Sequence, residues 1–97
     1  MSTPEGKVKD RIKKVLKASG AYYHMPLQNG MGGPTLDFIC CYNGMYFAIE
    51  AKAPDGKITL RQQHTIQQMR DAGAVVFVVY GDTHELENWL GQHLLGV

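Results

Sequence analysis

The apolar positions of the first twenty residues repeat with the period of an α-helix, and charged residues fill most of the positions between them. The residues at this spacing are Val8, Ile12, Val15 and Leu16. Pro4 suits the first turn and Gly20 is a typical C-terminal stop, so a helix is predicted over residues 4–19. Ser2 followed by Glu5 fits a capping box at the start of this helix.

Two later segments also carry helical patterns. Thr59 is a suitable N-cap for a second helix over residues 60–72, and Gly73 is placed to close it. A last helix is predicted after residue 82, and its inward positions are Leu86, Trp89, Leu90 and Leu94.

The middle of the chain carries the signal of a β-hairpin. Residues 35–42 and 45–52 are strand-like runs, and only Asn43 and Gly44 separate them. This dipeptide favours a two-residue turn, because both positions of that turn need a positive φ.

Two further strands complete the predicted sheet. Residues 21–28 resemble an edge strand, because Pro26 lacks the N–H group that a central strand needs. Residues 74–80, AVVFVVY, are apolar throughout and predict a central strand covered on both faces. The resulting order, α-β-β-β-α-β-α, predicts a single α/β domain over residues 1–97, with a mixed sheet flanked by helices.

Composition agrees with an ordinary globular protein, at 44% hydrophobic and 20% charged residues and a net charge of +1. No apolar run approaches the roughly 20 residues that a membrane-spanning helix needs, and no secretory signal is recognisable, so an intracellular protein without membrane contact is expected.

Cys40 and Cys41 are adjacent in a predicted strand, so they point to opposite faces; both are expected to be reduced and buried. Residues 1–20 carry six Lys or Arg and two acids, a pattern that suits either phosphate contacts or a solvated helix face.

The hairpin places two carboxylates together. A two-residue turn pairs Tyr42 with Met45, and the same register puts Asp37 opposite Glu50, with Cβ atoms about 4.5–5.5 Å apart. Like charges directly opposite each other are destabilising. A divalent cation such as Mg²⁺, which takes oxygen ligands, would offset this repulsion if it bound between the two carboxylates. Lys52 lies on the same face two residues on, within reach of a phosphate or water beside the metal. A surface ion pair between Glu50 and Lys52 is the plainer alternative.

Two polar residues on the predicted helices face the same region. Glu5 lies on the apolar stripe of the first helix, where it is either a capping residue or a further contributor to the site. Gln62 precedes Ile66 by four residues, so it faces the sheet from the second helix, at the site or at the edge of the core.

Asp37, the run Glu50-Ala51-Lys52 and the run Thr59-Leu60-Arg61-Gln62 together resemble the signature of the PD-(D/E)xK nucleases. More narrowly, they resemble the VRR-Nuc branch, whose small members occur in phages and bacteria. The similarity extends from Glu5 to about Tyr80 and includes the order of elements. The sequence departs from the family in one respect: the proline that usually precedes the aspartate directly is here Pro34, two residues further away.

The resemblance implies a restriction-endonuclease-like core and a catalytic set of Asp37, Glu50, Lys52 and Gln62. It also implies Mg²⁺ or Mn²⁺ bound by Asp37, Glu50 and the backbone carbonyl of Ala51, with Glu5 as a further candidate ligand. A structure-selective DNA endonuclease is therefore expected, such as a four-way (Holliday) junction resolvase acting as a homodimer. Such a protein would work in a bacterial cell or a phage-infected host. The alternative is a catalytically silent nucleic-acid-binding module on the same fold.

Overall fold

The computed structural model describes residues 3–28 and 32–94, which form an α/β fold around one mixed sheet. The elements of this described part are α1 (Pro4–Ser19), β1 (Tyr22–His24), β2 (Phe38–Tyr42), β3 (Met45–Ala51), α2 (Leu60–Asp71), β4 (Val75–Val79) and α3 (His84–Leu94). The predicted α/β class and order of elements are confirmed. No helix within these described ranges is long and apolar enough to cross a membrane.

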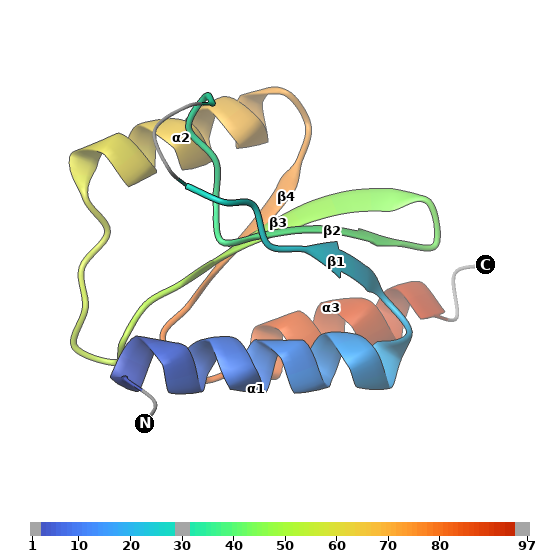
Figure 1. Ribbon diagram of the computed structural model, residues 1–97. Coiled ribbons are helices and arrows are strands. Elements are labelled where there is room, and N and C mark those ends of the chain that lie inside the picture. The colour runs from blue at the N-terminus through green and yellow to red at the C-terminus, as the bar shows by residue number, and fades with distance from the viewer. Residues whose placement is uncertain (1–2, 29–31, 95–97) are drawn as a thin grey trace.

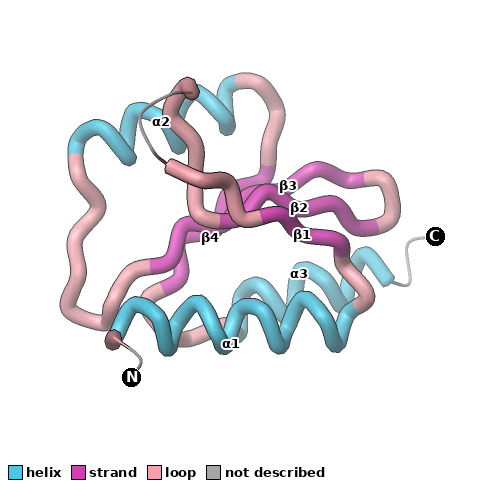
Figure 2. The backbone as a smooth tube through the Cα atoms, viewed as in Figure 1, coloured by secondary structure: helices cyan, strands magenta, loops and turns pink. Residues whose placement is uncertain are grey.

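The sheet is the middle layer of the molecule, with α1 and α3 on one face and α2 on the other (Figures 1 and 2). The larger core lies under α1 and α3, because alternate residues of β2, β3 and β4 point to that face. Its sheet residues include Phe38, Phe47, Ile49 and Phe77. A smaller core lies under α2, built from Leu36, Ala48, Ile66 and Val76.

The first helix begins as predicted at Pro4, but its cap is different. The N-cap is Thr3, whose side-chain oxygen accepts a hydrogen bond from the Gly6 N–H at 2.9 Å. The predicted capping box of Ser2 and Glu5 is therefore wrong, and Ser2 itself lies outside the described residues. The cause is Pro4, which prefers the first helical position and holds the residue before it in the extended conformation of an N-cap.

The hairpin register is confirmed. Tyr42 pairs with Met45, and the ladder continues to the pair Phe38 and Ile49. The turn works as expected because Asn43 and Gly44 have φ values of 49° and 78°, which match the twist of the flanking strands.

The prediction of a central strand at residues 74–80 is wrong. The strand order is β1-β2-β3-β4, so β4 is a terminal strand and pairs in parallel with β3. Its apolar sequence arises because helices cover both of its faces: Phe77 faces α3 and Val76 faces α2. The prediction of an edge strand near the start is confirmed for β1, although β1 is shorter than the predicted segment 21–28.

The adjacent cysteines face opposite sides of β2, as predicted, and neither forms a disulfide. Cys40 is buried in the core under α1 and α3, whereas Cys41 is exposed, so the expectation that both are buried is wrong for Cys41. The turn end of the hairpin extends past α2, which leaves that face of β2 open (Figure 1).

Candidate functional site

Asp37 lies directly before β2, at the end of the hairpin ladder. The register that pairs Phe38 with Ile49 brings Asp37 opposite Glu50, and each of the two carboxylates accepts a hydrogen bond from a backbone N–H group. The Asp37 N–H donates to Glu50 Oε1 at 3.2 Å, and the Ala51 N–H donates to Asp37 Oδ2 at 2.9 Å. The hairpin therefore brings both predicted carboxylates to the same end of the sheet and holds each by a backbone donor.

Glu50 is the most buried charged group of this set, with 3% of its surface exposed. Loss of hydration raises the pKa of its carboxyl from the ordinary 4.5 to about 7, and the neighbouring Asp37 charge contributes to the increase. The Asp37 N–H bond and the Lys52 ammonium lower this pKa by smaller amounts. A negative charge at Glu50 is thus poorly stabilised by the protein alone.

Gln62 connects Glu50 to the start of α2. Its Oε1 accepts from the Thr59 N–H at 3.0 Å, while the Gln62 N–H donates to Thr59 Oγ1 at 3.1 Å, so the two residues form a capping box. Its Nε2 donates to Glu50 Oε2 at 2.9 Å. The prediction that Gln62 faces the sheet is confirmed, and the contact shows that its amide orients Glu50.

Two lysines approach the carboxylates. Lys52 Nζ lies 4.0 Å from Glu50 Oε2, and only 13% of the Lys52 side chain is exposed, so the two residues are not a freely solvated surface pair. Lys9 of α1 lies 3.8 Å from Asp37 Oδ1 and 3.4 Å from Glu5 Oε2. Glu5 is thus held by Lys9, and its role as a further metal ligand stays a prediction.

Sequence reasoning missed Lys9 and Gln28. Gln28 Nε2 donates to Asp37 Oδ1 at 3.4 Å from the loop after β1. Lys9 follows Glu5 by one helical turn, so the helical pattern could have placed both at the site. No comparable signal exists for Gln28, because its position depends on the path of an irregular segment.

The donor set at this end of the sheet fits a hard divalent cation. Within the described residues, no three His, Cys, Asp or Glu side chains converge in a group that could hold a metal ion. The groups here that could hold an ion are the Asp37 and Glu50 carboxylates and the Ala51 carbonyl, which points to the same side of β3 as the Ala51 N–H that donates to Asp37. All three are oxygen donors, and Mg²⁺ is commonly bound by one or two carboxylates, with waters and substrate phosphates completing the shell.

Comparisons with the profiles of protein families, with curated proteins and with solved structures gave no match for this chain. The function is therefore inferred from the geometry of the site and from the sequence.

The raised pKa of Glu50 predicts that stability falls as pH rises. The unfolded chain releases this proton near pH 4.5 and the folded chain near pH 7, so between these values the folded state binds one proton more than the unfolded state. The free energy of unfolding should decrease by roughly 3 kcal/mol across this window in metal-free buffer. Urea denaturation of the wild type from pH 4.5 to pH 8 measures this change.

Glu50→Gln is the control for this effect, because it removes the titrating group at nearly constant size. The slope of stability against pH is the quantity to compare, since a glutamine amide facing Gln62 Nε2 alters the absolute stability by itself. An equal slope in wild type and Glu50→Gln would show that other groups cause the pH dependence.

Proposed function

We propose that this chain is a metal-dependent nuclease that hydrolyses phosphodiester bonds in DNA. The observation that carries this proposal is the Asp37 and Glu50 pair. Glu50 is buried beside a second carboxylate, and its pKa is raised to about 7. A cation bound between the two carboxylates would stabilise the ionised form of Glu50. The Lys52 ammonium lies 4.0 Å from Glu50 Oε2, which places a cation beside the carboxylate pair.

Each residue of the site has a separate proposed role. Asp37, Glu50 and the Ala51 carbonyl would hold Mg²⁺ or Mn²⁺. A bound ion of this kind supplies a water of lowered pKa and neutralises charge on the phosphate. Lys52 would orient the attacking water or stabilise the charge that develops on the phosphate in the transition state. Gln62 keeps Glu50 in one orientation through its bond to Oε2.

The fold and motif support the same activity. The order α-β-β-β-α-β, with Gln62 on the helix that follows the hairpin, is what the resemblance to the VRR-Nuc branch of the PD-(D/E)xK nucleases implies. We therefore propose a restriction-endonuclease-like core. Pro34 is exposed and is separated from Asp37 by Thr35 and Leu36, whereas the hydrogen bond from the Ala51 N–H holds the Asp37 carboxylate directly.

Branched DNA is the proposed substrate, including four-way junctions. The cations of α1 include Lys7, Lys14 and Lys17, which are exposed and suit phosphate contacts that do not depend on sequence. A junction needs two symmetric cuts, so a twofold homodimer with one site in each chain would meet this need.

The test is a cleavage assay with purified protein. Labelled four-way junction, flap and linear duplex are each incubated in Mg²⁺, in Mn²⁺ and in EDTA. Cleavage of branched DNA that requires a metal is the expected result. Binding of these DNAs in Ca²⁺ without cleavage in either catalytic metal would instead favour the silent binding module.

A further inference from the structure

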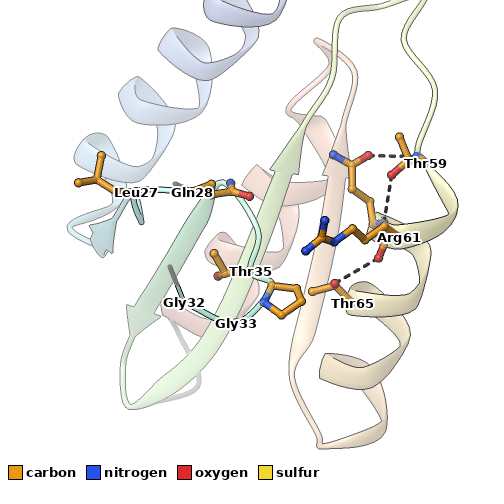
Figure 3. Close-up of a pocket in the computed structure, with 10 residues that line it drawn as sticks. Leu27, Gln28, Gly32, Gly33, Thr35, Thr59, Arg61 and Thr65 are labelled. Atoms are coloured by element: carbon orange, nitrogen blue, oxygen red, sulfur yellow. Dashed lines mark hydrogen bonds between the residues drawn. The ribbon is translucent and has the colours of Figure 1, made fainter. Parts of the chain in front are cut away.

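A pocket of about 350 Å³ lies between the loop that precedes Asp37 and the first turns of α2 (Figure 3). Its volume is within the range of small-molecule sites, roughly 300–1,000 Å³. The loop side contributes Leu27, Gln28, Pro34 and Thr35, and the helix side contributes Arg61 and Gln62 among others.

This pocket adjoins the carboxylate pair through two glutamine side chains. Gln28 and Gln62 both line it, and each donates a hydrogen bond to one of the two carboxylates, Gln28 to Asp37 at 3.4 Å and Gln62 to Glu50 at 2.9 Å. A ligand in the pocket would therefore be separated from the candidate metal ligands by a single layer of amide side chains.

The lining combines apolar surface with one cation. Leu27 is 88% exposed at the rim, and Pro34 is exposed as well, so both side chains are accessible to a ligand in the pocket. The Arg61 side chain points across the pocket toward Thr35 (Figure 3). Within residues 3–28 and 32–94, its guanidinium forms no hydrogen bond or ion pair.

Such a lining fits a flat, polar-edged ring. A guanidinium plane stacks on nucleobases, apolar side chains cover the opposite ring face, and hydroxyl and amide groups reach the base edges. A phosphate alone would use Arg61 but would leave Leu27 and Pro34 without a contact.

We infer that this pocket binds one unpaired nucleobase of the DNA, next to the phosphate at the carboxylate pair. The inference rests on the proposed function for the identity of the nucleic acid. A base inside a duplex cannot enter the pocket without unstacking, whereas a base at a branch point or a flap is already free to do so. The pocket thus provides selection for branched DNA in a chain whose described residues hold no separate recognition domain.

The test measures binding without cleavage. A single abasic site is moved through the nucleotides on both sides of the branch point of a flap and a four-way junction, and affinity is measured by fluorescence anisotropy in EDTA. Wild-type protein is expected to lose roughly fivefold or more in affinity at one or two positions. Arg61→Ala and Leu27→Ser should bind the intact DNA more weakly by a similar factor and show no further loss at those positions.

The control is Lys57→Ala, which removes one exposed cation outside the pocket and should keep the positional loss. Both pocket residues are exposed, so the variants are expected to fold, which circular dichroism checks. Equal affinity for every abasic DNA would overturn the inference, even if the protein cuts DNA. An absence of DNA binding would also overturn the inference. The same holds if Arg61→Ala lowers the affinity for every DNA equally and no abasic position matters, because Arg61 would then contact a phosphate and not a base. A positional loss in a protein that never cuts would support the pocket and reject the nuclease.

Discussion

The Lys52→Ala variant is expected to cleave branched DNA roughly 10²-fold or more slowly than the wild type, with folding and metal binding nearly unchanged. Lys52 is not a metal ligand in the proposed site, but its ammonium lies 4.0 Å from Glu50, where the reacting phosphate would be held. DNA affinity should fall much less, since one cation among several contributes only part of the electrostatic attraction. Single-turnover cleavage beside DNA binding in Ca²⁺ measures the two effects separately.

The matched control is Lys57→Ala, which removes the same charge from an exposed position in the loop between β3 and α2. Because Lys52 lowers the pKa of Glu50, the variants are compared near pH 8.5, above the Glu50 pKa of about 7, so that Glu50 is ionised in each. Full activity in Lys52→Ala would mean that Glu50 and Lys52 are only a structural ion pair.

Removing either carboxylate is expected to abolish both metal binding and cleavage. A cation that binds only the folded chain stabilises it by about 1.4 kcal/mol at ten times its dissociation constant, which corresponds to several degrees in Tm. Glu50→Ala and Asp37→Asn should lose most of this increase. Asp37→Asn should also raise the metal-free Tm at neutral pH, because the Asp37 charge opposes ionisation of Glu50. Calorimetry with and without Mg²⁺ or Mn²⁺ measures both quantities.

Asp55→Asn controls for the change in net charge, because Asp55 is exposed in the turn after β3 and does not line the candidate site. It should keep the full metal-dependent increase in Tm. If the same increase is seen in Asp37→Asn and Glu50→Ala, the metal binds elsewhere and the proposed site is wrong.

The hairpin and the second helix were predictable because their signals are local. Asn43 and Gly44 fix the turn type and hence the register, which alone brings Asp37 to Glu50. Thr59 fixes the start of α2, and helical periodicity then turns Gln62 toward the sheet. Each of these inferences depends on neighbours within a few residues.

The errors arise where local patterns are ambiguous. The apolar run of β4 shows that both faces of the strand are covered by helices. It does not show whether the strand is central or terminal, because a terminal strand covered on both faces has the same pattern. At the N-terminus, Ser2 and Thr3 are both good caps, and the preference of Pro4 for the first helical position decides between them. Gln28 reaches Asp37 from the irregular segment after β1, and no local pattern in the sequence specifies the path of that segment.

The shared amide of Gln62 also links the dynamics of two distant parts of the chain. The first turn of α2 cannot fray without breaking the Thr59 bond, and movement of Gln62 also releases Glu50. An ionised Glu50 accepts a stronger hydrogen bond from Gln62 than a protonated one, so it anchors the helix cap more firmly. After correction for intrinsic rates, exchange of the Thr59 amide proton with deuterium should therefore slow as Glu50 ionises. The exchange rate at a helix cap then reports the charge of a buried strand residue.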